Sequence, residues 1–213
     1  MKLPRVYPIV DGAAWVSRLA RQGVRLVQLR VKDRTEEAVR AEILAAQAYC
    51  GAAGVQLVVN DHWRLALASG CDFVHLGQGD LEGADLPALR RAGVRLGIST
   101  HDESELERAL ALRPDYVALG PIYPTLLKVM PWRPQGLARI GEWKRRIGSL
   151  PLIAIGGLTA ERLAGVFAAG ADVAAVVTDI VRAPDPDARV RQWLAVAEAA
   201  CAPASASGRR ESA

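Results

Sequence analysis

The chain has few cysteines and no long apolar run. Its three cysteines, Cys50, Cys71 and Cys201, lie far apart and match neither a metal-binding spacing nor a CxxC motif, so we expect buried thiols in a reducing compartment. No uncharged apolar run reaches the roughly 18 residues of a membrane span, and the first residues lack the apolar segment of a signal peptide. These absences predict a cytoplasmic protein without a membrane partner.

Lysine is also scarce. Of the 27 basic residues only Lys2, Lys32, Lys128 and Lys144 are lysine, and the arginines are dispersed, so the net charge of +4 does not predict nucleic-acid binding. Where arginine is the usual cation, a lysine indicates a position that suits a compact charge. Lys32 and Lys128 both fall in the motifs described below.

Strand-like and helix-like segments alternate along the whole chain, which is 51% apolar and of a length that suits one domain. Strands are predicted at 5–10, 24–31, 55–60, 73–76, 94–98, 116–119, 152–155 and 173–177. Helices are predicted at 12–22, 35–50, 63–69, 86–92, 103–112, 137–147, 160–169 and 187–200. Eight such units in 213 residues predict an α/β fold, a single-domain (β/α)8 TIM barrel over 1–202, with a disordered tail at 203–213. An open doubly wound sheet is the alternative.

The second predicted strand carries an unusual polar face. Its alternation places Gln28, Arg30 and Lys32 on one side and Leu29 and Val31 on the other. If both faces of the strand are covered, an amide and two cations point into an enclosed space, which favours an anionic ligand. An edge strand with a solvated polar face is the alternative.

Carboxylates follow the next two predicted strands. Asn60 and Asp61 come directly after the third, and Asp80 follows the fourth in the loop Gly77-Gln78-Gly79-Asp80. Two carboxylates beside two cations suit a phosphorylated ligand that arrives with Mg²⁺, which takes one or two carboxylates plus phosphate oxygens. Capping of a helix by Asp61, or a surface role for Asp80, is the alternative.

The remaining strand ends carry groups that suit phosphate. Ser99 follows the fifth strand, as a phosphate donor or as the start of a helix, and a long loop at 120–135 follows the sixth. Gly156-Gly157 follows the seventh strand and Val177-Thr178 ends the eighth, where barrels of this type commonly hold a phosphate. No side chain is set beside an obvious base as a covalent nucleophile. We therefore expect an enzyme that joins two phosphorylated small molecules, with pyrophosphate leaving under electrostatic stabilisation.

These motifs together resemble thiamine-phosphate synthase. They are Gln28-x-Arg30-x-Lys32, Asn60-Asp61, Gly77-Gln78-x-Asp80, Gly97-x-Ser99-Thr100-His101, Gly120-Pro-x-Tyr-Pro-Thr125, Gly156-Gly157 and Val177-Thr178, and the likeness extends from about residue 5 to 200. The segment from Lys128 to Leu137 is similar to the proteobacterial branch. The resemblance implies a transferase that condenses hydroxymethylpyrimidine diphosphate with a thiazole phosphate, or its carboxylated form, to give thiamine phosphate and pyrophosphate.

The resemblance also implies roles for individual residues. The pyrimidine diphosphate would be held by Gln28, Leu29, Arg30, Val31, Lys32, Asn60, Ser99 and Lys128, and catalysis would fall to Arg30, Lys32, Ser99 and Lys128. One Mg²⁺ would be held by Asp61 and Asp80. The thiazole phosphate would be held by Thr125, Leu126, Leu127, Gly157, Val177 and Thr178.

Two positions depart from the family's pattern. Leu127 stands where the family usually has threonine, and Thr178 where it usually has serine. The alternatives in function are a thiazole tautomerase of the same superfamily, which needs neither metal nor diphosphate, and a non-catalytic barrel that binds thiazole phosphate or thiamine phosphate. The sequence leaves a homo-oligomer possible and does not fix the oligomeric state.

Overall fold

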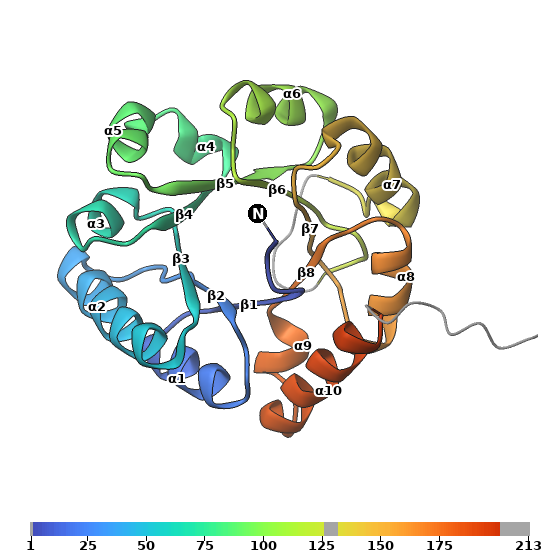
Figure 1. Ribbon diagram of the computed structural model, residues 1–213, viewed down its shortest axis with the longest axis horizontal. Coiled ribbons are helices and arrows are strands. Elements are labelled where there is room, and N and C mark those ends of the chain that lie inside the picture. The colour runs from blue at the N-terminus through green and yellow to red at the C-terminus, as the bar shows by residue number, and fades with distance from the viewer. Residues whose placement is uncertain (1, 126–131, 201–213) are drawn as a thin grey trace, which may run out of the picture.

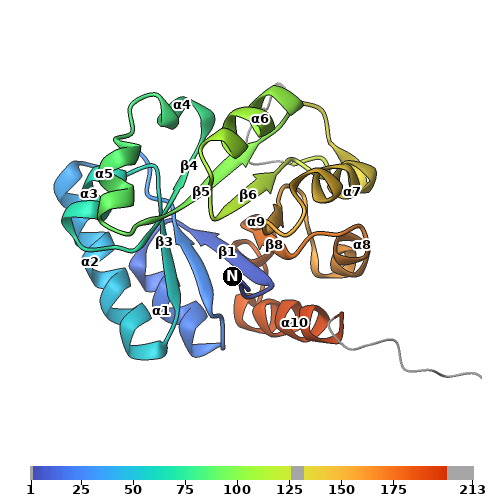
Figure 2. The same ribbon diagram turned by 45° about the horizontal axis from the view of Figure 1, so that its top comes forward.

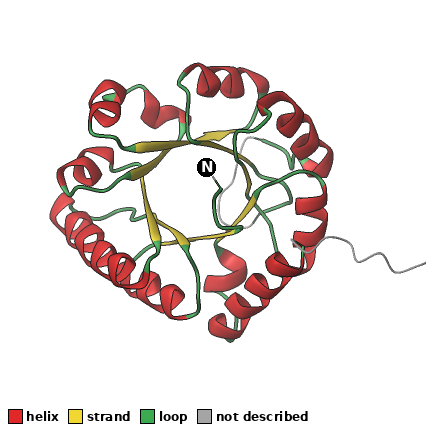
Figure 3. Ribbon diagram, viewed as in Figure 1, coloured by secondary structure: helices red, strands yellow, loops and turns green. Residues whose placement is uncertain are grey.

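Eight parallel strands form a closed barrel in chain order, β1 to β8, with β8 pairing back to β1. The computed structural model describes residues 2–125 and 132–200. Figure 1 shows the ring of strands inside a ring of helices, and Figure 3 separates the two layers by colour. The strands are β1 (Val6–Val10), β2 (Leu26–Leu29), β3 (Gln56–Asn60), β4 (Phe73–Leu76), β5 (Arg95–Thr100), β6 (Tyr116–Leu119), β7 (Leu152–Ala154) and β8 (Val173–Val176). The predicted barrel is confirmed, and the open-sheet alternative is wrong.

Helices follow the strands and cover the outside of the barrel (Figure 2). They are α1 (Ala13–Arg21), α2 (Glu36–Ala53), α3 (Trp63–Ala68), α4 (Gln78–Leu81), α5 (Leu86–Arg91), α6 (Glu103–Ala111), α7 (Gly136–Ile147), α8 (Leu163–Ala168), α9 (Thr178–Val181) and α10 (Pro186–Ala199), with a 3-10 turn, η1 (Ala160–Arg162), before α8. Two short helices, α4 and α9, were not predicted. In the described part of the chain no helix is both long and apolar enough to cross a membrane.

The helices begin and end where the local chemistry of the sequence places them. The Thr35 hydroxyl accepts a hydrogen bond from the Ala38 amide at 3.3 Å, and Glu36 and Glu37 lie in the positive first turn of α2. The helix ends at Gly54, whose φ of 63° is in the left-handed region that glycine adopts without strain. Such local signals explain why these boundaries could be read from the sequence.

Side chains alternate between two hydrophobic layers along each strand. One set, which includes Leu29 and Val59, packs against the surrounding helices. The other set fills the barrel interior and includes Leu26, Val58 and Phe73. Leu3, which precedes β1, belongs to the interior set, and the described chain that leads into β1 lies within the ring of strands in Figure 1. The interior is therefore packed at the amino ends of the strands, and polar side chains gather at the carboxyl ends.

The predicted tail at 203–213 and Cys201 lie outside the described residues, so the disorder of the tail and the burial of Cys201 stay predictions. Cys50 and Cys71 are free and buried, as predicted. Burial raises the pKa of each thiol to about 11, so both are neutral near pH 7.

Candidate active site

The predicted site residues gather at one rim of the barrel. Because all eight strands run the same way, their carboxyl ends meet at a single mouth. Going around this rim, β2 to β5 present Arg30, Asn60, Asp80 and Ser99 at or just beyond their ends, and β6 to β8 present the loop and turns of the predicted monophosphate site. Leu126, Leu127 and Lys128 lie outside the described residues.

The polar face of β2 divides between the barrel interior and the rim. Gln28 is 2% exposed and donates to the Tyr7 hydroxyl at 3.0 Å, whereas Arg30 and Lys32 follow the strand and are exposed. Since β2 pairs with both β1 and β3, the edge-strand alternative is wrong. Leu29 and Val31 pack toward the helices, so only their main chain is available to a ligand in the mouth.

Lys32 and Asp61 follow the neighbouring strands β2 and β3 and form an ion pair at the rim. The Lys32 ammonium contacts the Asp61 carboxylate, and Asp61 has a φ of 59°, which few residues other than glycine, asparagine and aspartate adopt readily. Burial alone would raise the pKa of Asp61, but the hydrogen bond and charge of Lys32 lower it overall. The predicted capping alternative fails for Asp61, because α3 begins after His62 without a side-chain cap.

The Asp80 carboxyl group interacts with both Gly77 and Asp61. It accepts a hydrogen bond from the Gly77 amide at 3.2 Å in the first turn of α4, and the residue is exposed, as the alternative of a surface role also requires. Burial, the charge of Asp61 and a hydrogen bond with it raise the pKa of Asp80. The two carboxyl groups therefore share one electrostatic environment.

The donor set fits Mg²⁺ only in company with a ligand. The described residues contain no group of three or more His, Cys, Asp or Glu side chains arranged to hold a metal ion. Asp61 and Asp80 supply two carboxylates, and Mg²⁺ commonly takes one or two together with substrate phosphate and water. A diphosphate held by Arg30 and Lys32 would supply the missing oxygens.

A chain of hydrogen bonds crosses the upper barrel interior from Gln28 to Ser99. The Tyr7 and Tyr116 hydroxyls are 3.0 Å apart, the Tyr116 hydroxyl is 2.8 Å from Nδ1 of His75, and Nε2 of His75 is 2.8 Å from Oγ of Ser99. Burial lowers the pKa of His75 to about 4, so the imidazole is neutral near pH 7. The helix-start alternative for Ser99 is wrong, because Asp102 caps α6.

Most of this hydrogen-bond network was not predicted from the sequence. Tyr7 and Tyr116 are 109 residues apart, and nothing local indicates that their hydroxyls meet. Tyrosines at inward positions of two predicted strands were the available signal, since a buried phenol needs a partner. His75 joins the two ends of this network, because one ring nitrogen contacts Tyr116 and the other contacts Ser99.

The Gly156-Gly157 turn packs directly on the loop that follows β6. Gly156 and Gly157 have φ values of 97° and 64°, and a Cβ on Gly156 would lie 2.6 Å from the Cα of Pro121. A Cβ on Gly157 would lie 2.8 Å from that of Tyr123 and would overlap the Pro124 carbonyl. The Tyr123 amide donates to the Gly156 carbonyl at 3.0 Å. Only glycine fits at both positions, and the two loops form one wall of the mouth.

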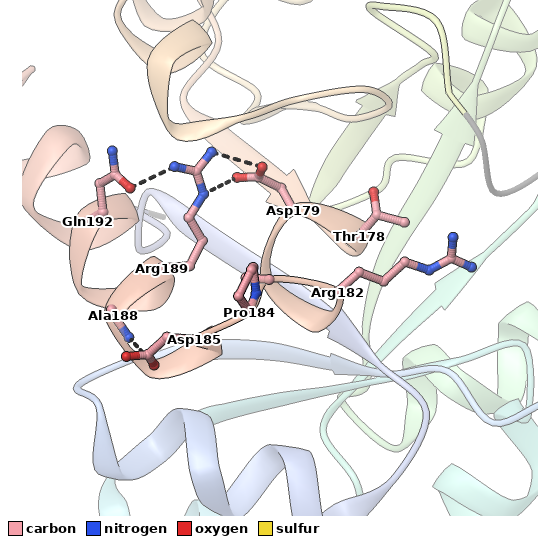
Figure 4. Close-up of a pocket in the computed structure, with 9 residues that line it drawn as sticks. Thr178, Asp179, Arg182, Pro184, Asp185, Ala188, Arg189 and Gln192 are labelled. Atoms are coloured by element: carbon pink, nitrogen blue, oxygen red, sulfur yellow. Dashed lines mark hydrogen bonds and ion pairs between the residues drawn. The ribbon is translucent and has the colours of Figure 1, made fainter.

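The Val177-Thr178 pair enters α9, which is held from behind by α10. Arg189 donates to both carboxylate oxygens of Asp179 at 2.8 Å, and the Trp193 indole donates to the same group at 2.6 Å. Thr178 and Arg182 lie on the other side of α9 from Arg189 and share with it the lining of a cavity of about 510 Å³ (Figure 4). These contacts hold α9 against α10 at the end of β8.

A family model described as thiamine monophosphate synthase matches residues 6–180. The chain belongs to the thiamine monophosphate synthase family. It is 63% identical over 195 residues to a thiamine-phosphate synthase of Rhizobium etli, covering 92% of this chain and 96% of that one. It is also 49% identical over 180 residues to that of Cronobacter sakazakii, covering 84% and 86%.

Solved structures confirm the fold. The barrel superposes with a TM-score of 0.83 on a thiamine phosphate pyrophosphorylase from Pyrococcus furiosus, at 21% identity, with 93% of this chain and 97% of that one covered. A 3-hexulose-6-phosphate synthase gives a TM-score of 0.65 at 19% identity, covering 91% and 99%. At these identities the likeness concerns the barrel alone, and the evidence for family membership is in the sequence. The predicted membership of the thiamine monophosphate synthase family is confirmed.

Proposed function

We propose that this protein is a thiamine-phosphate synthase that condenses hydroxymethylpyrimidine diphosphate with a thiazole phosphate, releasing pyrophosphate. The observation that carries the proposal is the division of the rim into two halves. Cations and carboxylates follow β2 to β4, with Ser99 at the end of β5, and the glycine turn and Thr178 follow β7 and β8. The relatives in Rhizobium etli and Cronobacter sakazakii carry this activity in their names. Because both substrates are charged and do not cross membranes freely, we place the reaction in the cytoplasm.

The diphosphate half would act by charge. Arg30 and Lys32 are exposed at the rim and would bind the diphosphate oxygens, with Ser99, Asn60 and Lys128 completing the contacts. Lys32 would leave Asp61 for the diphosphate. The C–O bond to pyrophosphate breaks and its electron pair leaves with the pyrophosphate, so a pyrimidine carbocation remains. Arg30 and Lys32 stabilise the negative charge that develops on the leaving group.

The metal site belongs to the same half. Asp61 and Asp80 would hold Mg²⁺, which supplies Lewis-acid stabilisation of the leaving group. Freed from Lys32, the Asp61 carboxylate is available as a ligand, and its φ of 59° holds it at the end of β3. Asp80 keeps its hydrogen bond from the Gly77 amide, which orients the second carboxylate.

The monophosphate half would position the second substrate. Main-chain amides of the glycine turn, with Val177, Thr178 and the segment 125–127, would hold the thiazole phosphate. The thiazole nitrogen then donates its lone pair to the pyrimidine carbocation and forms the new C–N bond. No side chain forms a covalent intermediate, so the chemistry depends on positioning and charge.

Release of pyrophosphate tests the proposal. Purified protein is given both phosphorylated substrates, each substrate alone, and both with and without Mg²⁺. Release that needs both substrates and the metal supports the synthase. Isomerisation of a thiazole phosphate without metal or diphosphate would establish the tautomerase instead, and binding without turnover would establish the non-catalytic barrel.

A further inference from the structure

One arginine joins the two loops that wall the monophosphate half of the mouth. Arg162, the last residue of η1, donates through Nη1 to the Gly157 carbonyl. Its guanidinium also lies over the Tyr123 ring, 4.3 Å from the ring centroid. The side chain thus links the turn after β7 to the loop after β6, although Arg162 itself is exposed.

These contacts fix the orientation of two consecutive peptide groups. The Gly156 carbonyl accepts from the Tyr123 amide at 3.0 Å, and the Gly157 carbonyl accepts from Arg162. Both peptide bonds are trans, so each N–H points away from the carbonyl of its own peptide group. The amides of Gly157 and Leu158 are therefore held pointing away from Tyr123 and Arg162.

The two amides have no acceptor in the described part of the chain: neither donates to a main-chain or side-chain oxygen there. Consecutive N–H groups in a turn with positive φ make a concave site for anions. Gly157 has a φ of 64°, and a cation lies directly on its carbonyl. The turn is thus polarised for a negatively charged oxygen.

We propose that Arg162 is a positioning residue that holds the Gly157 and Leu158 amides in place to bind the phosphate monoester of the second substrate. This inference rests on the proposed function for the identity of that substrate, and on the geometry alone for the anion. Arginine suits the role because its planar guanidinium can stack on a ring and donate in its own plane at the same time. Lysine has a point charge and does not satisfy both contacts.

The first test measures anion binding without any reaction. Inorganic phosphate is titrated into ¹⁵N-labelled protein, and the amide signals of Gly157 and Leu158 are followed in the wild type, Arg162→Gln and Arg162→Lys. We expect phosphate to shift both signals in the wild type, with an affinity about tenfold lower in Arg162→Gln and an intermediate value in Arg162→Lys.

A matched control is available at the opposite end of the barrel. Arg90 is also exposed and also donates to a main-chain carbonyl, that of Leu112, at 2.6 Å, just after α6 ends. Arg90→Gln removes the same type of contact far from the mouth. It should leave both phosphate binding and the catalytic constants unchanged.

The second test separates the two substrates. In Arg162→Gln the KM for the thiazole phosphate should rise about tenfold, whereas kcat and the KM for the pyrimidine diphosphate change less than about twofold. A merely structural role would shift both KM values together and would overturn the inference. It is also overturned if phosphate fails to shift the two amides in the wild type, or shifts them with equal affinity in Arg162→Gln.

The two proposals fail in different ways. If the wild type releases no pyrophosphate but binds phosphate at these amides in an Arg162-dependent manner, the synthase proposal is wrong and the role of Arg162 stands. If the wild type is an active synthase and the Arg162 variants bind both ligands normally, the function stands and the role of Arg162 is wrong.

Discussion

Gly97 of β5 lies against the ring of Tyr116 on β6, so closely that a Cβ at position 97 would overlap the ring carbons. The glycine makes the space that allows a tyrosine side chain to lie inside the barrel. Tyr116 is fully buried there, and its hydroxyl reaches both Tyr7 and His75. The absence of one side chain on β5 thus determines which polar groups meet beneath the mouth.

Gly97→Ala should destabilise the protein by about 1–3 kcal/mol, because the added methyl group forces the Tyr116 ring out of its position. Urea unfolding measures the change. Gly51→Ala is the control, since Gly51 lies in α2 with no atom near its missing Cβ, and alanine there should add up to about 1 kcal/mol of stability. Equal effects of the two substitutions would show that the Gly97–Tyr116 contact is unimportant for stability.

Tyr7→Phe should cost about 1–3 kcal/mol of unfolding free energy, because it leaves the buried Gln28 amide and the Tyr116 hydroxyl each with one hydrogen bond fewer. Tyr49→Phe, at a tyrosine that is 45% exposed, should change stability by less than about 0.5 kcal/mol. In a double-mutant cycle with Gln28→Met, Tyr7→Phe should reduce the unfolding free energy less in the Gln28→Met background than in the wild type. Strictly additive losses would mean that the two side chains act independently.

Asp61→Asn should reduce activity much more at limiting than at saturating Mg²⁺, because the amide replaces one anionic ligand and weakens metal binding. Asparagine also tolerates the φ of 59° at this position, so the backbone is preserved. Asp33→Asn is the matched control, since Asp33 has a φ of 55° and is not among the residues proposed to bind the metal or a substrate. The same loss of activity at every Mg²⁺ concentration would exclude Asp61 as a ligand.

Glu161 should make the protein more sensitive to acid between pH 4.5 and 2. The hydrogen bond from Arg189, with a smaller one from Thr159, lowers the pKa of Glu161 from 4.5 to about 2. A carboxyl group with a lowered folded-state pKa contributes stability above its unfolded pKa and loses it as the pH falls through the folded value. Because Glu161 is largely exposed, the contribution stays below about 1 kcal/mol.

Urea midpoints measured from pH 7 to pH 2 check this expectation. The stability advantage of the wild type over Glu161→Gln should be constant near neutral pH and should vanish toward pH 2. Glu198→Gln, at an exposed position of α10, should show no such change with pH. A wild-type advantage that persists at pH 2 would rule out the ion pair with Arg189 as its source.

The barrel could be predicted from the sequence because its information is local. Caps such as Thr35, terminal glycines such as Gly54 and the alternation along each strand act within a few residues. The helices α4 and α9 were missed, since four residues carry too little periodicity to be recognised. α9 in particular depends on Arg189, which is ten residues away from Asp179 in sequence.

The site was predictable where strand ends alone determine position. Parallel strands bring their carboxyl ends to one rim, so Asp61, Asp80 and Ser99 could be placed there without knowing any contact. Side-chain contacts between neighbouring loops and turns were not predictable. The pairing of Lys32 with Asp61 and the link from Arg162 to Gly157 depend on side-chain directions that only the closed structure shows.

One arrangement of protons gives every group from Gln28 to Ser99 a partner. In that arrangement the Gln28 amide nitrogen donates to the Tyr7 oxygen, and the Tyr7 hydroxyl donates to Tyr116. The Tyr116 hydroxyl then donates to Nδ1 of neutral His75, and the proton on Nε2 is donated to Ser99. The Ser99 proton is left for an acceptor in the mouth. With its protons arranged in this way, an amide inside the barrel makes a serine at the rim a donor, which suits an anionic substrate.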